Sequence, residues 1–153
     1  MDLDTLLNKN QKEAATYLDS HLRIIAGAGS GKTRVVTYRI AHLIQDVGID
    51  PRSILAITFT NKAANEMKER VNEVVGIHGS GTLICTIHSL CVRLLRQHIN
   101  VLNYPSNFTI MDEEDQKALI KKLYTQLEID AKVISIKSMI NTISSYKTAR
   151  VSP

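Results

Sequence analysis

A glycine-rich stretch carries the residues of this chain that are best suited to chemistry. Residues 26–33 read AGAGSGKT, which matches the relaxed phosphate-loop pattern with alanine in place of its first glycine. The three glycines at 27, 29 and 31 permit backbone angles that other residues avoid, so successive N–H groups can turn toward phosphate oxygens. Lys32 would pair with the β- and γ-phosphates of a nucleotide, and the Thr33 hydroxyl would ligate Mg²⁺. The stretch predicts a triphosphate site with Lys32 as catalytic residue and Thr33 as metal ligand.

A glycine-rich turn with a solvated lysine is the alternative interpretation of this stretch. The surrounding pattern argues against it, because the motif follows a short apolar segment, Leu22–Ala26, that we interpret as a strand. A helix is expected directly after the motif, from about Lys32 to Asp46. A strand before the loop and a helix after it are the context that a phosphate loop requires, since the helix N-terminus attracts anions.

The elements that must position this loop alternate between strands and helices. Further strands are expected at Ser53–Thr60 and at Thr82–Thr86. The first of these is nearly continuous in apolar residues, which is typical of a strand that is covered on both faces. Helices are expected at about 9–18, 62–75 and 88–99, with Gly48 and Gly76 placed to end the second and third helices of the chain. This order predicts an α/β fold with a parallel sheet flanked by helices.

The pattern changes after Pro105. Two amphipathic helices are expected, at Asp112–Leu127 and at about Ile136–Lys147. We therefore predict two domains, a partial nucleotide-binding domain at 1–104 and the beginning of a helical subdomain at 105–153.

The stretch FTIMDE at 108–113 imitates the acidic strand that supplies Mg²⁺ ligands in many nucleotide hydrolases. Asp112 is well placed to cap a helix, and the acidic residues that follow it favour the positive end of that helix. We interpret this stretch as a helix start and not as a magnesium site.

The bulk composition is that of a globular protein, with 44% hydrophobic and 22% charged residues. A formal net charge of +4 is compatible with a nucleic-acid partner but does not require one. The sequence contains no apolar run of roughly 20 residues and no signal-peptide pattern, so we expect a cytoplasmic protein without a membrane partner. Cys85 and Cys91 are interpreted as reduced packing residues.

Four stretches resemble, in order and spacing, the motifs of UvrD/Rep/PcrA-type superfamily 1 DNA helicases. LNKNQ at 7–11 resembles the Q motif, and AGAGSGKTR at 26–34 resembles the family's phosphate loop. ITFTNKAANEMKER at 57–70 resembles motif Ia, and TLICTIHSLCVRLLR at 82–96 resembles motif Ib. FTIMDEEDQ at 108–116 also looks like the family's entry into its helical 1B subdomain. The resemblance implies a P-loop NTPase (RecA-like) fold, with part of domain 1A followed by the start of 1B.

The resemblance implies that the nucleotide is ATP, bound with Mg²⁺. Gln11 would read the donor and acceptor edges of adenine, and Arg34 would stack its guanidinium plane on the base. Each role has a structural alternative, because Asn8 and Gln11 have the spacing of a capping box and Arg34 could be an ordinary exposed helix residue. The nucleotide-binding residues so predicted are Gln11, Ala26, Gly27, Ala28, Gly29, Ser30, Gly31, Lys32, Thr33 and Arg34.

The resemblance also implies contacts with single-stranded DNA at the carboxyl ends of the two later strands, an edge that ligands favour in open α/β sheets. The threonines and the asparagine there could instead cap helices, and Phe59 could belong to the core. Ile87 stands where the family usually has an aromatic residue. The predicted DNA-binding residues are Phe59, Thr60, Asn61, Thr86 and His88.

As a whole the resemblance implies an ATP-dependent 3′–5′ DNA helicase and single-strand translocase in repair or replication. Its partners would be single strands, junctions of single- and double-stranded DNA, and the remaining helicase domains, 2A and 2B. In the family the acidic motif II follows residue 153 and the arginine finger lies in the second motor domain, so we expect negligible hydrolysis by this chain alone. A non-catalytic nucleotide or single-strand binding module and a nuclease-coupled helicase subunit remain alternatives. A small kinase or GTPase is disfavoured because no NKxD motif is present.

Overall fold

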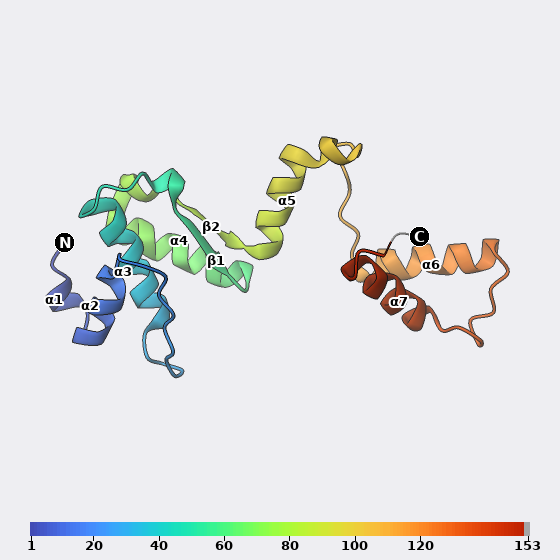
Figure 1. The fold of residues 1–153 in the computed structure, drawn as a ribbon, viewed down its shortest axis with the longest axis horizontal. Helices are drawn as coiled ribbons and strands as arrows, with labels where there is room; N and C mark the ends of the chain where they lie inside the picture. Colours follow the sequence, from blue (N-terminus) through green and yellow to red (C-terminus); the bar gives the residue numbers. More distant parts are fainter. Residues whose placement is uncertain (152–153) are drawn as a thin grey trace. The chain divides into compact units, whose positions relative to one another are not determined.

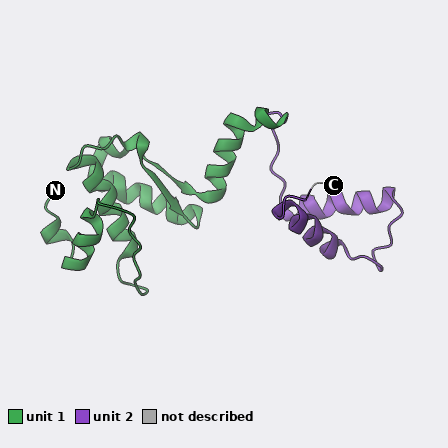
Figure 2. Cartoon of the chain, viewed as in Figure 1, with its two compact units in different colours: residues 1–103 green, residues 104–153 purple. Residues whose placement is uncertain are grey.

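The computed structural model describes residues 1–151 (Figure 1). Residues 152 and 153, which end the predicted helical subdomain, lie outside the described part. The chain divides into two compact units, residues 1–103 and 104–153 (Figure 2). Within the described residues we find no helix that is both long and apolar enough to cross a membrane.

The first unit contains a small parallel sheet of two strands, β1 (Leu55–Thr58) and β2 (Leu83–Thr86) (Figure 1). The register pairs Ala56 with Ile84 and Thr58 with Thr86. Parallel strands cannot be joined by a tight turn, and here helix α4 (Asn61–Val75) lies in the connection between them. Both strands lie inside the predicted ranges, and the predicted parallel pairing is confirmed.

The strand predicted at Leu22–Ala26 is not formed. This segment has irregular backbone, and Ile25 is 86% exposed. A strand is maintained by backbone hydrogen bonds to a neighbour, but the sheet of the described residues contains only β1 and β2. The segment is apolar, but among the described residues no neighbouring strand pairs with it.

The prediction that the strand at 53–60 is covered on both faces is also wrong. Ala56 is buried, while Leu55 and Ile57 are each 49% exposed. Successive side chains of a strand point to opposite faces, and Ala56 and its register partner Ile84 face the buried cluster. The apolar run therefore spans one covered face and one open face.

The first unit contains five helices, and two of them are followed by glycines with positive φ. In chain order they are α1 (Leu3–Leu6), α2 (Lys9–Thr16), α3 (Lys32–Gln45), α4 and α5 (Ile87–His98), with 3₁₀ turns at Pro51–Ser53, Gly76–Gly79 and Ile99–Leu102. Gly76 follows α4 with a φ of 65°, and Gly48 follows α3 with a φ of 81°. Both glycines occupy the left-handed region that ends helices. The four predicted helices of this unit are confirmed to within two residues, and α1 was not predicted.

Two hydrophobic clusters lie on either side of α3. The larger cluster joins α3, α4 and the sheet, and its members are Ile40, Ala41, Ala56, Ala64, Met67, Val71, Val75 and Ile84. The smaller cluster joins α1, α2 and α3, and its buried members are Leu3, Leu7, Ala15 and Val35. Burial of apolar surface on both sides holds α3 against its neighbours.

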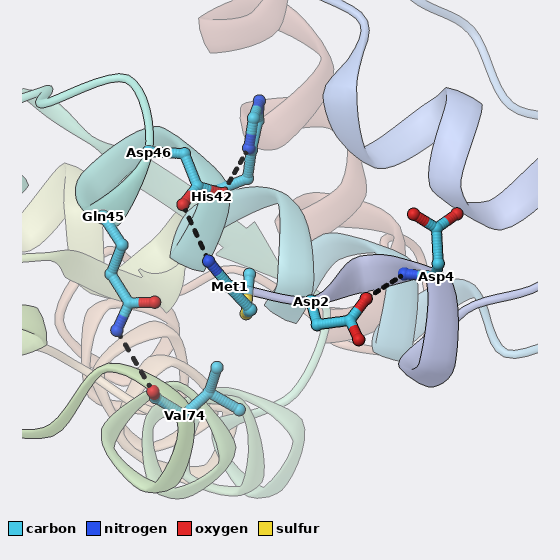
Figure 3. Close-up of polar contacts among 7 residues, drawn as sticks. All are labelled: Met1, Asp2, Asp4, His42, Gln45, Asp46 and Val74. Carbon is cyan, nitrogen blue, oxygen red and sulfur yellow. Dashed lines mark hydrogen bonds and ion pairs between the residues drawn. The ribbon is translucent and has the colours of Figure 1, made fainter.

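Polar contacts close the end of α3 that lies farthest from the glycine loop (Figure 3). The ammonium group of Met1 lies 3.1 Å from Asp46 Oδ1, and His42 Nδ1 lies 2.8 Å from Asp46 Oδ2. Hydrogen bonds from His42 and from the terminal ammonium hold the pKa of the Asp46 carboxyl below its ordinary value. Gln45 Nε2 donates to the Val74 carbonyl at 3.3 Å, which links α3 to α4.

Helix α5 and one of the two cysteines are less buried than the residues of the hydrophobic clusters. Among the described residues, α5 contributes no buried side chain. Both cysteines are free; Cys85 in β2 is half-buried, whereas Cys91 in α5 is exposed. The interpretation as a packing residue is therefore wrong for Cys91.

The second unit contains α6 (Glu113–Gln126) and α7 (Ile136–Thr148), close to the two helices predicted there. Asp112 caps α6 by accepting from Asp115 N at 2.8 Å, and its own N–H donates to Asp115 Oδ2 at 3.3 Å. Residues 108–112 form no strand. The interpretation of the FTIMDE stretch as a helix start is confirmed.

The sheet's unequal faces yield a stability prediction. Ile84 is 2% exposed, so Ile84→Ala is expected to destabilise the protein by about 2–5 kcal/mol through lost burial and a residual cavity. Leu55→Ala, on the open face of the neighbouring strand, is expected to cost less than half as much. Urea unfolding of both variants measures the difference, and equal costs would contradict the assignment of a single covered face.

Candidate functional site

The glycine loop connects the irregular segment after α2 to the first turn of α3. Gly29 and Gly31 have φ values of 76° and 83°, in the left-handed region that favours glycine. Gly27 does not have positive φ, so the expectation of special backbone angles is confirmed for two of the three glycines and wrong for Gly27. The Ser30 N–H donates to the Gly27 carbonyl at 3.4 Å, which folds the loop back on itself.

Lys32 is exposed at the start of α3, and its ammonium group is bonded to the loop that precedes it. Nζ donates to the Gly27 carbonyl at 2.6 Å and to the Ala26 carbonyl at 3.0 Å. Thr33 follows in the first turn of α3 and is exposed. The loop thus places a cation and a hydroxyl side by side at the N-terminus of a helix of 14 residues, where the helix dipole favours an anion.

Gln11 connects α2 to the glycine loop. Asn8 Oδ1 accepts from Gln11 N at 2.9 Å, and Gln11 Oε1 accepts from Asn8 N at 3.1 Å, so the capping box is confirmed. Gln11 Nε2 also donates to the Ser30 carbonyl at 3.0 Å. A hollow of about 260 Å³ lies beside these groups, lined by α2, residues 24–26 and the loop. The side chain that the sequence suggested for adenine contact therefore borders an accessible space.

Arg34 is exposed but is not an unsupported helix residue. Its Nη2 and Nε donate to the Leu6 carbonyl at 2.8 and 3.2 Å. Its guanidinium carbon lies 5.5 Å from the centre of the Tyr38 ring, within the range of a cation–π contact. Tyr38 and Leu6 together hold the guanidinium plane of Arg34 in place.

Polar residues follow both strands of the sheet. Thr60 Oγ1 accepts from Ala63 N at 3.1 Å at the start of α4, and Thr86 Oγ1 accepts from Ser89 N at 3.2 Å at the start of α5. Capping by the two threonines, proposed as the alternative to DNA contact, is confirmed. Thr86 Oγ1 also lies 3.4 Å from Asn61 Oδ1, so the structure brings the ends of the two strands together.

Phe59 and His88 lie on the surface near these caps. Phe59 is 98% exposed, so the interpretation of this ring as a core residue is wrong. His88 is exposed in the first turn of α5. Apart from the bonds of Arg34 to Leu6, the hydrogen bonds of the predicted site residues fall into two groups, one around the loop and Gln11 and one at the strand ends.

Three residues that support these groups were missed in the sequence. Ser89 shares the cap with Thr86, and the spacing of the two residues, from N-cap to N3, is the same signal that identified Asn8 and Gln11. Tyr38 supports Arg34 from one turn further along α3. Arg39 Nη1 donates to the Tyr17 carbonyl at 2.6 Å and to the Ala14 carbonyl at 3.2 Å, which secures the C-terminal end of α2. The contacts of Arg39 had no local signal, because they join segments that are distant in sequence.

Comparison with known proteins decides the family. The model for the UvrD/REP helicase N-terminal domain matches residues 7–153. The chain belongs to the UvrD/REP helicase family. The family resemblance found in the four motifs is thereby confirmed.

Several relatives are known at high identity. The chain is 46% identical over 147 residues to the ATP-dependent DNA helicase PcrA of Bacillus subtilis, and it is 45% identical over 147 residues to the PcrA proteins of Staphylococcus aureus strain Mu50 and Staphylococcus epidermidis. These alignments cover 96% of this chain and 20% of each relative. The chain thus spans one fifth of the length of these helicases.

The cap at Thr86 supports a second stability prediction. Thr86 is 5% exposed, so Thr86→Ala leaves the Ser89 N–H without its acceptor and is expected to cost about 1–2 kcal/mol. Thr86→Ser retains Oγ and is expected to keep most of the stability. Urea unfolding of the two variants separates the hydroxyl from the methyl group, and a larger loss in the serine variant would contradict the capping role.

Proposed function

We propose that this chain is the ATP-binding and single-strand-binding part of an ATP-dependent DNA helicase that moves 3′–5′ along one strand. The observation that carries the proposal is the loop of residues 26–33, with two left-handed glycines and an exposed lysine at the N-terminus of α3, in a chain of the UvrD/REP helicase family. In this proposal the chain has the P-loop NTPase fold of domain 1A and contains the beginning of subdomain 1B.

Lys32 supports the triphosphate part of the proposal. Its ammonium group donates to two neutral backbone carbonyls, and phosphate oxygens are stronger acceptors for a cation than neutral carbonyls are. A bound triphosphate would therefore draw Nζ away from Ala26 and Gly27. The N–H groups of the loop and of the first turn of α3 would supply further donors. Thr33 would ligate the Mg²⁺ that accompanies ATP.

Arg34 and Gln11 support the nucleoside part. The guanidinium plane of Arg34 rests over the Tyr38 ring and is bonded to the Leu6 carbonyl, so it is already oriented before any base arrives. A flat cation held in this way can stack on adenine. Gln11 borders the hollow beside the loop with an amide that carries both donor and acceptor atoms.

The strand ends support the DNA part. The Phe59 ring is almost fully exposed beside the first cap, and an exposed aromatic ring can stack on an unpaired base of any sequence. Thr60, Asn61 and Thr86 lie at helix N-termini, where phosphates of a DNA backbone find N–H and hydroxyl donors. His88 in the first turn of α5 completes the proposed set.

In the proposed motor, ATP binding and hydrolysis would change the grip on the strand as two motor domains close and open. Domains 2A and 2B would supply the other side of the ATP cleft, and the substrate would be a junction of single- and double-stranded DNA. Repair or replication is the proposed setting.

The phosphate site is tested by replacing Lys32. Lys32→Ala removes the only side-chain cation of the loop 26–33 and is expected to weaken MgATP binding at least tenfold, because hydrogen bonds to a charged group contribute about 1.5–3 kcal/mol. Lys68→Ala, an exposed lysine of α4, is the matched control. Calorimetric titration measures both affinities. An unchanged affinity in Lys32→Ala would refute the proposed site.

The DNA site is tested at Phe59. Phe59→Leu keeps an apolar side chain but removes the aromatic face, and it is expected to weaken binding of a labelled oligo-dT by at least fivefold, since stacking contributes about 1–3 kcal/mol per base. Phe59→Tyr keeps the ring and is expected to bind like the unmodified chain. Fluorescence anisotropy at low salt measures these affinities, and equal binding by all three proteins would remove Phe59 from the site.

A further inference from the structure

One side chain joins the capped start of α2 to the glycine loop. Gln11 Nε2 donates to the Ser30 carbonyl at 3.0 Å across 19 residues of sequence. The same amide accepts from Asn8 N through Oε1 at 3.1 Å. Gln11 is therefore bonded at both ends of its amide before any ligand arrives.

We propose that Gln11 is a positioning residue that sets the conformation of the phosphate loop, and that it couples the base position to the triphosphate position. The inference rests on the proposed function, since it concerns the same ATP site. It goes beyond adenine contact, because it assigns Gln11 an effect on phosphate binding that does not need a base.

The physical link is the peptide between Ser30 and Gly31. A peptide group is planar and trans, so its carbonyl and its N–H point in opposite directions. A bond from Gln11 to the Ser30 carbonyl holds that carbonyl toward α2, and it thereby aims the Gly31 N–H away from α2. Gly31 immediately precedes the first residue of α3, where N–H groups are the donors that an anion would use. Gln11 therefore controls the direction of one of the loop's donors.

Gly31 fits this arrangement for a second reason besides its φ of 83°. A Cβ atom at position 31 would lie 2.8 Å from Gln11 Nε2, closer than real Cβ contacts allow. Any side chain there would displace the amide of Gln11. The glycine thus leaves room for the bond to Ser30, and the two positions are matched to each other.

The helix that carries Gln11 is itself firmly held. Ala15 of α2 is fully buried, in the same hydrophobic cluster as Val35 of α3. Arg39 of α3 donates to the carbonyls of Ala14 and Tyr17 at the opposite end of α2. Because α2 is anchored to the same helix that starts at the loop, Gln11 acts from a fixed support.

Gln11 retains the capacity to contact a base while it holds the loop. A primary amide has two N–H donors and an oxygen with two lone pairs, and the bonds to Ser30 and Asn8 use one of each. The second N–H and the second lone pair would be available to adenine. Adenine would then restrain the same amide that orients the Gly31 N–H, which couples the two ends of the nucleotide.

The experiment measures binding of inorganic tripolyphosphate with Mg²⁺, a probe that has the phosphates of ATP and no base. Gln11→Met keeps the length of the side chain and removes the hydrogen bonds that the amide makes to Ser30 and Asn8. It is expected to weaken tripolyphosphate binding about fivefold, because the bond from Gln11 to Ser30 that holds the loop is a single hydrogen bond between neutral groups. Asn8→Ala is the matched control, because it removes the other half of the same capping box and leaves the bond from Gln11 to Ser30. Its affinity for tripolyphosphate is expected to stay within twofold of the unmodified chain.

The outcomes separate the two proposals. If the unmodified chain binds tripolyphosphate and Gln11→Met binds it equally well, Gln11 does not position the loop, although adenine contact could still hold. If the unmodified chain does not bind the probe at all, the proposed phosphate site fails and this inference fails with it. Equal weakening in Asn8→Ala and Gln11→Met would assign the effect to the helix cap and overturn the inference.

A measurement on the unmodified chain does not depend on the folding of any variant. The NMR resonances of the Gln11 side-chain amide are expected to shift when tripolyphosphate is added, because the bond to Ser30 responds to occupation of the loop. Resonances that stay in place at saturating probe would overturn the proposal.

Discussion

The packing of α3 between two hydrophobic clusters is the constraint on which the candidate site depends. The helix begins at Lys32, directly after Gly31, so any displacement of its axis would move Lys32 and Thr33 with it. Val35 is buried against α1 and α2, while Ile40 and Ala41 are buried against α4 and the sheet. The large free energy of apolar burial thus fixes the helix, and the weaker polar contacts around it only need to adjust the loop.

The polar contacts around α3 and at the strand ends share one pattern. Each joins the end of one element to a neighbouring element. Arg34 and Arg39 project from α3 and donate to the last carbonyls of α1 and α2, carbonyls that no helix can satisfy internally. At the strand ends, Thr86 caps α5 and also lies within hydrogen-bonding distance of Asn61 in α4. Thr86, which we propose as a DNA contact, is therefore also a helix cap.

The open face of the sheet carries apolar side chains that are not covered. Leu55 and Ile57 are half exposed, and Leu22, Ile24 and Ile25 lie in an irregular segment with little burial. These residues are as apolar as the members of the core cluster. What distinguishes them is the lack of a packing partner among the described residues, and this difference is one of tertiary contact.

Local signals in the sequence determined the helices from α2 onward and several of their ends, but not the short helix α1. Gly48 and Gly76 mark helix ends because left-handed angles favour glycine, and Asn8 and Asp112 start helices because their side chains accept from N–H groups three residues away. The motifs, read together, also determined the family. Each of these signals depends on residues that are close in the chain, so the sequence contains the whole interaction.

Only the tertiary structure decided which apolar residues are covered, and which long-range bonds support the site. The segment 22–26 formed no strand and Phe59 no core contact, because a ladder and a core both need partners that composition does not specify. The same holds for the bond between Gln11 and Ser30, which joins residues 19 positions apart. Such contacts depend on how helices pack against one another, and that packing is decided by the fold as a whole.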